Sequence, residues 1–234
     1  RPRVQPWEPG ELGRFLDQAA RDPLSALFEV AAFTGLRRGE LLGLQWEDVD
    51  VERSRLTVRR QIVQLGHETR VGPVKTSSGQ DRVVDLDAAT VAALLAHRLR
   101  QEQYRTVMGA GWVESGHVFT REDGSTLDPH WVTKRFREVC VQAGVRPIRL
   151  HDLRHGQASL MLAAGVPMAV VSKRLGHSSL AITSDTYSHL LEGVGQQAAT
   201  AAAALVPRND LRTQNEHSAL NIDPPGDREL SNGA

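Results

Sequence analysis

The chain has 234 residues, and 40% of them are hydrophobic, which is enough for a folded core and excludes wholesale disorder. Its 28 Lys and Arg balance 28 Asp and Glu, so the net charge is zero, and its single cysteine excludes an internal disulfide or a cysteine-rich zinc site. No apolar run approaches the ~20 residues that a membrane span requires.

The first third of the chain predicts helices followed by a strand. Helices are expected over about 9–20, about 24–34 and 37–44, and Gly35 separates the second from the third. The segment Arg55–Leu65 alternates polar and apolar residues and is rich in Val, Ile and Thr, which indicates a strand.

Two more strands are expected at Val71–Thr76 and Arg82–Leu86, joined by a turn at 77–80. We therefore expect one small antiparallel sheet over about 55–86. Lys75 would then lie at the tip of a hairpin.

The remainder of the chain has a helical pattern. Helices are predicted over 88–103, 129–143, 150–164, 168–175, 179–188 and 190–204, with Gly or Pro between them. Residues 207–234 contain few large apolar side chains, so we expect a disordered or loosely attached tail. The predicted fold class is mainly α with a small antiparallel β-sheet (α+β).

Although the net charge of the chain is zero, the segment 130–177 is basic, because it contains eight Lys and Arg but only two acidic residues. A local excess of this kind can bind a polyanion such as DNA, and net charge does not report it. Lys134, Arg135, Lys173 and Arg174 are the candidate contacts. The alternative is a solvated basic face.

Two short segments carry a cation in a position suited to phosphate. Arg37 follows a glycine turn that leads into a helix, where free backbone N–H groups and a planar guanidinium can bind phosphate oxygens. The alternative is a surface arginine paired with Glu40. Lys75 could donate a proton, although an idle, solvated lysine is the simpler interpretation.

The segment His151–His155 places His151 and Arg154 on one helix face, with His155 one turn above His151. It also resembles the His-Glu-x-x-His zinc motif. Arg154 would put a permanent cation among the ligands, and no third ligand follows at the spacing of the metzincin motif, so we expect no metal site. A core or capping role for one histidine, and a zinc hydrolase built on both, remain as alternatives.

The last cluster is His177, which follows the helix-ending Gly176, together with Tyr187 on the next helix. A tyrosine on an apolar face is usually part of the core. Together, however, the clusters supply two arginines, two or three histidines, a lysine and a tyrosine, without clustered carboxylates for Mg²⁺. This set suits phosphodiester chemistry in which guanidiniums neutralise phosphate oxygens, a phenol attacks, and Lys and His move protons.

Five segments resemble the conserved boxes of the tyrosine recombinase (phage integrase) catalytic domain, in that family's order and spacing. These segments are Thr34–Leu44, Val74–Leu86, His151–His155, Leu175–Ser178 and Asp185–Leu190. The resemblance runs from about Glu8 to Leu191 and implies the catalytic-domain fold of that family, which is helical with a small antiparallel sheet.

The resemblance also implies a role for each motif residue. The implied catalytic residues are Arg37, Lys75, His151, Arg154, His177 and Tyr187, and Glu40 and His155 are implied to support them. Tyr187 would attack a DNA phosphate and leave a 3′-phosphotyrosyl enzyme with a free 5′-hydroxyl, without ATP, metal or other cofactor. Gly156 stands where the family often has Thr or Ser, and this difference casts little doubt on the implied activity.

The family normally has an N-terminal core-binding domain that completes a clamp around DNA. We expect that domain to be absent from this chain, which does not begin with methionine, and we expect a catalytic domain at 1–206 followed by the tail at 207–234. The implied partners are double-stranded DNA attachment sites and three more protomers in a homotetrameric synapse, with an accessory directionality factor as a further candidate. The implied setting is the cytoplasm, on DNA of a phage or other mobile element and without a membrane.

The resemblance leaves other functions open. A topoisomerase- or resolvase-like strand transferase would use the same residues. An inactive DNA-binding module is a different class of protein, and the intact set of catalytic side chains argues against it.

Overall fold

The computed structural model of the protein describes residues 5–65, 68–74, 79–187 and 204–205. The chain divides into two compact units, Arg1–Leu190 and Leu191–Ala234, and the fold below is that of the first. The predicted tail and its boundary at 206/207 lie outside the described residues, as does the helix predicted at about 190–204 except for its last residue.

Helices dominate the first unit, and most begin and end where local signals predict. They are α1 (Pro9–Ala19), α2 (Ser25–Thr34), α3 (Arg38–Gly43), α4 (Ala88–Met108), α5 (Pro129–Gln142), α6 (Asp152–Ala163), α7 (Met168–Leu175) and α8 (Leu180–Tyr187). The Asp128 carboxylate caps α5 by accepting from the Trp131 N–H at 2.8 Å, with Pro129 in the first turn. Gly35 and Gly176, at φ +66° and +67°, end α2 and α7 in the left-handed conformation.

The strands form two small antiparallel sheets rather than the single sheet expected. The strands are β1 (Val49–Asp50), β2 (Arg55–Val58), β3 (Arg60–Leu65), β4 (Glu68–Pro73) and β5 (Arg82–Asp85). One sheet has the order β1-β2-β5, and the other is the pair β3-β4. In the first sheet Leu56 lies opposite Val84, and in the second Ile62 lies opposite Val71.

The strand predictions therefore need two corrections. The single strand predicted at Arg55–Leu65 is two strands, separated at Arg59, that belong to different sheets. The strands near Val71–Thr76 and Arg82–Leu86 do not pair with each other as a hairpin, because β4 pairs with β3 and β5 pairs with β2. Alternation identifies a strand and its buried face, but it carries no information about which partner completes the sheet.

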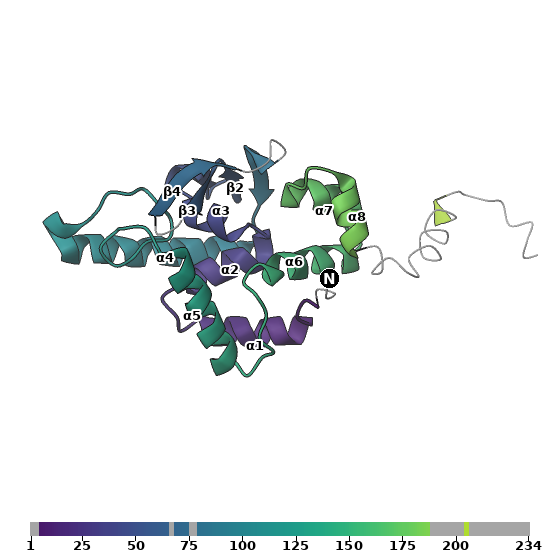
Figure 1. The fold of residues 1–234 in the computed structure, drawn as a ribbon, viewed down its shortest axis with the longest axis horizontal. Coiled ribbons are helices and arrows are strands. Elements are labelled where there is room, and N and C mark those ends of the chain that lie inside the picture. Colours follow the sequence, from purple (N-terminus) through teal and green to yellow (C-terminus); the bar gives the residue numbers. More distant parts are fainter. Residues whose placement is uncertain (1–4, 66–67, 75–78, 188–203, 206–234) are drawn as a thin grey trace, which may run out of the picture. The chain divides into compact units, whose positions relative to one another are not determined.

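The core lies around α2, which packs against α1, α3, α4 and α6. Figure 1 shows the strands and α3 on one side of α2 and α4, with α1 and α5 on the other side. Four aromatic rings, those of Trp7, Phe15, Phe28 and Phe136, pack between α1, α2 and α5 with centroid separations from 5.0 to 5.9 Å. This core holds the C-terminal end of α2 rigidly, and the candidate site is built on that end.

None of the described helices is both long and apolar enough to cross a membrane.

Candidate active site

The site begins where α2 ends and α3 starts. Arg37 is the N-cap residue of α3, and its backbone N–H donates to Glu40 Oε2 at 2.8 Å. The Arg37 guanidinium also donates through Nη1 to Glu40 Oε1 at 2.7 Å. The side chain of Glu40 is fully buried, whereas 26% of the Arg37 side chain is exposed. The structure therefore brings the predicted pair together, with the arginine turned toward solvent and the carboxylate beneath it.

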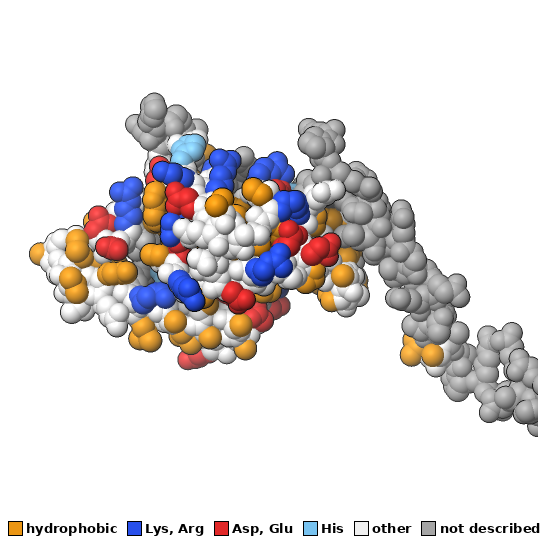
Figure 2. All heavy atoms as spheres, turned by 90° about the horizontal axis from the view of Figure 1, so that it is seen from below, with side chains coloured by type: hydrophobic (Ala, Val, Ile, Leu, Met, Phe, Trp, Pro, Cys, Tyr) orange, Lys and Arg blue, Asp and Glu red, His pale blue; other side chains and the backbone are white. Residues whose placement is uncertain are grey.

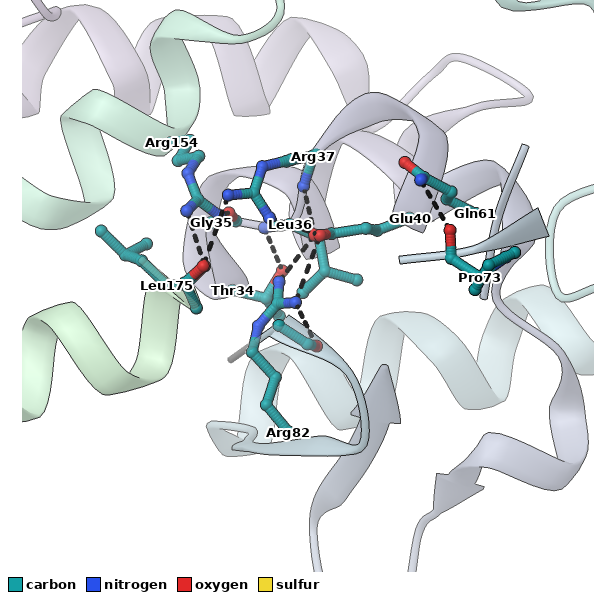
Figure 3. A network of polar contacts seen from close by, with 12 residues as sticks. Thr34, Gly35, Leu36, Arg37, Glu40, Gln61, Pro73, Arg82, Arg154 and Leu175 are labelled. Atoms are coloured by element: carbon teal, nitrogen blue, oxygen red, sulfur yellow. Dashed lines mark hydrogen bonds and ion pairs between the residues drawn. The ribbon is translucent and has the colours of Figure 1, made fainter. Parts of the chain in front are cut away.

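A second arginine, Arg82 on β5, binds the same carboxylate from the other side. Its Nη2 donates to Glu40 Oε2 at 2.6 Å and its Nη1 to Glu40 Oε1 at 3.2 Å (Figure 3). Burial by itself raises the pKa of Glu40, but the hydrogen bonds and charges of Arg82 and Arg37 outweigh it and lower the pKa below its usual value. Glu40 is therefore a carboxylate shared by two guanidiniums.

Arg154 on α6 reaches the same place from a third direction. Its Nη1 donates to the Gly35 carbonyl and its Nη2 to the Leu175 carbonyl, both at 2.6 Å, and only 3% of the residue is exposed (Figure 3). Burial, followed by the positive charge of Arg37, lowers the pKa of Arg154 to about 9, which leaves the group charged at neutral pH. Gly35 is required here, because a Cβ on it would lie 2.6 Å from Leu175 Cδ2.

The predicted nucleophile contacts a histidine. The Tyr187 hydroxyl lies 2.6 Å from His155 Nδ1, and Tyr187 is 4% exposed. Burial raises the pKa of Tyr187 to about 12. Burial also lowers the pKa of His155, so the ring is neutral near pH 7 and can accept the phenol proton.

His151 lies beside this pair, with its ring 5.3 Å from that of His155 between centroids and at a right angle to it. Partial burial, followed by the charges of His155 and Arg154, lowers the pKa of His151, although the residue stays open to solvent. His151 is therefore more exposed to solvent than His155 and His177, which are half-buried.

His177 contacts a threonine on α8. Its Nδ1 lies 2.8 Å from the Thr183 hydroxyl. Burial, followed by the charges of Arg154 and Arg37, lowers the pKa of His177 to about 4. The ring is therefore neutral at physiological pH and can donate or accept a hydrogen bond beside the arginines.

The remaining predicted residues are Lys75 and the four candidate DNA contacts. Lys75 falls outside the described residues, so its position relative to Arg37 stays a prediction. Lys134 and Lys173 are exposed, whereas Arg135 is paired with Asp22 at 2.6 Å and with a second carboxylate. Arg174 donates to two backbone carbonyls.

The surface charges are mixed. On the face shown in Figure 2, Asp and Glu side chains lie among the described Lys and Arg side chains, with hydrophobic groups between them. The roles predicted for Lys134, Arg135, Lys173 and Arg174 in DNA binding therefore stay predictions.

Sequence reasoning missed Arg82, although a signal was present. In β5 buried and exposed positions alternate, and the Arg82 side chain lies on the same buried face of the strand as that of Val84. A charged residue on the buried face of a strand needs a buried partner of opposite charge. Glu40, placed by its own helix in the core, is that partner.

Two observations limit the chemistry of the site. No set of three or more His, Cys, Asp or Glu side chains in the described part of the chain is placed to hold a metal ion. A pocket of about 740 Å³ between α4 and the α1–α2 turn contains none of the site residues. The cluster of arginines and histidines, not that pocket, carries the reactive groups.

Comparison with known proteins shows the family to which the chain belongs. Residues 9–193 match the model of the phage integrase family. A tyrosine recombinase XerC-like protein of Caldanaerobacter subterraneus is 33% identical over 199 residues, covering 80% of this chain and 51% of that protein. The ICEBs1 integrase of Bacillus subtilis is 29% identical over 192 residues, covering 81% and 52%. The chain thus spans about half the length of these curated relatives.

Solved structures share the fold. A XerA recombinase aligns with a TM-score of 0.62 at 25% identity, covering 88% of this chain and 66% of that one. The Tn1549 transposon integrase, in complex with a circular intermediate DNA, aligns with a TM-score of 0.66 at 18% identity, covering 94% and 66%. The mainly helical fold with small antiparallel sheets is therefore that of tyrosine recombinase catalytic domains.

Proposed function

We propose that this chain, which belongs to the phage integrase family, cuts and rejoins DNA at specific sites through a 3′-phosphotyrosyl intermediate. The observation that carries the proposal is the 2.6 Å contact between the Tyr187 hydroxyl and His155, beside Arg37 and Arg154. A nucleophile, a proton acceptor and two fixed cations are the parts that phosphodiester transfer requires.

The first step is attack by Tyr187 on the scissile phosphate. The bond between the tyrosine oxygen and phosphorus forms, the bond from phosphorus to the 5′-oxygen breaks, and His155 takes the phenol proton. Arg37 and Arg154 have unused N–H groups that can bind the non-bridging oxygens as charge develops on them. His151 and His177 supply further hydrogen bonds at the phosphate.

The departing 5′-oxygen needs a proton, because an alkoxide leaves poorly at neutral pH. We assign that proton to Lys75, because a lysine ammonium can act as a general acid. Attack by a 5′-hydroxyl of a partner duplex on the phosphotyrosine then reverses the step. The phosphotyrosyl bond conserves the energy of the original phosphodiester, so the cycle needs no ATP, metal or other cofactor.

The partners follow from this chemistry and from the family. They are double-stranded DNA attachment sites, three further protomers in a homotetrameric synapse, and an accessory directionality factor. Lys134, Arg135, Lys173 and Arg174 are proposed to contact phosphates outside the scissile position. Because the proposed substrate is DNA, the reaction is proposed to take place in the cytoplasm, on the DNA of a phage or other mobile element.

The test is covalent capture of DNA. The chain is incubated with a pool of duplexes that carry a randomised segment and one nick, so that cleavage near the nick releases a short fragment and traps the adduct. Adducts that survive denaturation in detergent are collected, and their DNA is sequenced to give a defined substrate. We expect a 3′-linked adduct with the natural chain and none with Tyr187→Phe.

The chain has only two tyrosines, so Tyr104→Phe is a matched control and should form the adduct normally. An adduct formed by Tyr187→Phe would contradict the assignment of the nucleophile. A chain that binds DNA but never forms an adduct would be an inactive DNA-binding module. Relaxation of supercoils without exchange between duplexes would indicate the topoisomerase-like alternative.

A further inference from the structure

Three consecutive carbonyl oxygens at the C-terminal end of α7 each accept a hydrogen bond from a different arginine. The pairs are Arg174 O with Arg82 Nε at 3.2 Å, Leu175 O with Arg154 Nη2 at 2.6 Å, and Gly176 O with Arg37 Nη2 at 3.4 Å. The last carbonyls of a helix have no partners within the helix and carry partial negative charge. The end of α7 therefore gathers three guanidiniums around one turn of backbone.

Among these arginines, Arg82 has its guanidinium fixed on every side. Besides its two bonds to Glu40, it donates through Nη1 to the Gly79 carbonyl at 3.0 Å and through Nε to the Arg174 carbonyl. A Cβ on Gly176 would lie 2.9 Å from Arg82 Cδ, so only glycine leaves room for the side chain. The plane of the Arg82 guanidinium is thus determined by backbone that flanks it.

Glu40 transmits this constraint to Arg37. Each oxygen of the carboxylate accepts one bond from Arg82 and one from Arg37: Oε1 from the two Nη1 groups, and Oε2 from Arg82 Nη2 and the Arg37 backbone N–H. Figure 3 shows the carboxylate between the two guanidiniums. Rotation of the carboxylate would break bonds to both arginines at once.

Exposure separates the roles of these two arginines. The side chain of Arg82 is 5% exposed and that of Glu40 is fully buried, whereas 26% of the Arg37 side chain is open to solvent. Arg37 can therefore touch a phosphate on a bound duplex, whereas four of the five N–H groups of Arg82 already donate to Glu40 and to two backbone carbonyls and are not free to bind one. Glu40 is the residue that contacts both arginines, so it is the route by which Arg82 reaches Arg37.

We propose that Arg82 is a positioning residue for DNA cleavage, which fixes through Glu40 the direction in which the Arg37 guanidinium points. The proposal rests on the function proposed above. Lysine cannot replace Arg82, because one ammonium cannot hold both carboxylate oxygens and two carbonyls in a single plane.

The test uses Arg82→Lys, which keeps a cation beside the buried carboxylate and so protects the fold. The rate of adduct formation is measured in single turnover, at saturating protein, on the DNA sequence recovered by covalent capture. A double-mutant cycle is built from four chains: the natural chain, Arg82→Lys, Arg37→Ala and the variant with both changes. Arg55→Lys is the matched control, because Arg55 lies on the neighbouring strand and pairs with Asp50, without touching Glu40.

We expect Arg82→Lys to slow cleavage by about 10²-fold in the natural chain, the effect of a misplaced catalytic group, without weakening DNA binding. In the Arg37→Ala background the same change should slow cleavage by less than about threefold, because nothing is left for it to position. Arg55→Lys should cleave at the natural rate.

A second readout separates positioning from loss of stability. A methylphosphonate at the scissile position removes one charged oxygen, so a guanidinium aimed at that oxygen matters less. Arg82→Lys and Arg37→Ala should both lose less activity on this substrate than on ordinary DNA. Should Arg82→Lys unfold, the neutral pair Arg82→Gln with Glu40→Gln takes its place in the same cycle.

Two results would overturn the proposal. One is an equal slowing by Arg82→Lys in the natural and the Arg37→Ala backgrounds, which would mean a general structural role. The other is natural cleavage by Arg82→Lys. If the natural chain itself forms no Tyr187 adduct, the proposed function fails and this proposal fails with it, whereas the first two results leave the proposed function intact.

Discussion

Removal of the His155 imidazole should change how cleavage depends on pH. His155 Nδ1 lies 2.6 Å from the Tyr187 hydroxyl, and burial lowers the pKa of the ring, so His155 is neutral at pH 7 and can take the proton. Natural cleavage should therefore be flat around neutral pH and fall only in acid, where His155 becomes protonated. In His155→Ala, only tyrosine that is already ionised can attack.

The raised pKa of Tyr187, about 12, sets the size of the effect. At pH 8 that value leaves about one phenol in 10⁴ ionised, and each further pH unit raises this fraction about tenfold. A positioned general base typically contributes about 10²–10⁴ in rate, which is the same range. His155→Ala should therefore be slower by about 10²–10⁴ at pH 8 and should gain about tenfold per pH unit.

The assay is single-turnover adduct formation between pH 6.5 and 9, with His130→Ala as the control because His130 is exposed on α5, away from the tyrosine. Unfolding curves at each end of the range check that the variants remain folded. A flat profile for His155→Ala, parallel to the natural one, would refute the reasoning and move the proton transfer to His151 or to water.

Three other changes test separate parts of the site. Gly35→Ala places a Cβ 2.6 Å from Leu175 Cδ2 at φ +66°, so strain and overpacking should lower the free energy of unfolding, measured in urea, by about 2–5 kcal/mol. The control is Gly13→Ala, whose Cβ meets nothing within 4 Å and which should raise the free energy of unfolding by about 0.5–1 kcal/mol. Equal effects of the two substitutions would contradict this reasoning. Lys75→Ala should slow cleavage of ordinary DNA but cut DNA with a bridging 5′-sulfur at nearly the natural rate, since a thiolate leaves without a proton; no recovery would remove Lys75 as the general acid. Cleavage in excess EDTA should match cleavage in Mg²⁺ at equal ionic strength, and an absolute need for a divalent ion would revive a metal-dependent mechanism.

The helices could be predicted because their signals are local. Asp128 followed by Pro129 starts α5, and Gly35 and Gly176 end α2 and α7, as the sequence indicates. The bounds of α7, Met168–Leu175, agree with the predicted helix at 168–175. Each of these signals acts within a few residues of the position that it determines.

The sheets could not be predicted in the same way. Three consecutive polar residues, Arg59, Arg60 and Gln61, interrupt the alternation over Arg55–Leu65 where β2 gives way to β3, but such a break does not show that the two halves belong to different sheets. The pairing of Leu56 with Val84 joins residues 28 positions apart, and it depends on the surface against which each strand packs. Sequence alone therefore predicted strands near 55–65, 71–76 and 82–86, but neither β1 nor the partner of each strand.

The site shows the same division between local and distant information. Arg37 and Glu40 are three residues apart and could be paired from the sequence, and the structure confirms this pair. The contacts of His155 with Tyr187 and of Glu40 with Arg82 join residues 32 and 42 positions apart, so their side chains meet only through the fold. The resemblance implied a catalytic role for His151, while the structure brings His155 to the tyrosine hydroxyl.

The clustering of like charges explains how the site can favour a phosphate. Arg37 and Arg82 bind the buried Glu40 carboxylate, and Arg154 joins them at the last carbonyls of α7, so three formal positive charges lie around a single formal negative charge at Glu40. The carbonyl dipoles reduce the repulsion but add no formal charge. A bound phosphate supplies the missing negative charge, and the extra charge that develops as the tyrosine attacks meets donors that are already fixed in place. Because those donors need not reorganise during the proposed reaction, we expect the cluster to stabilise the transition state more than it stabilises the bound duplex.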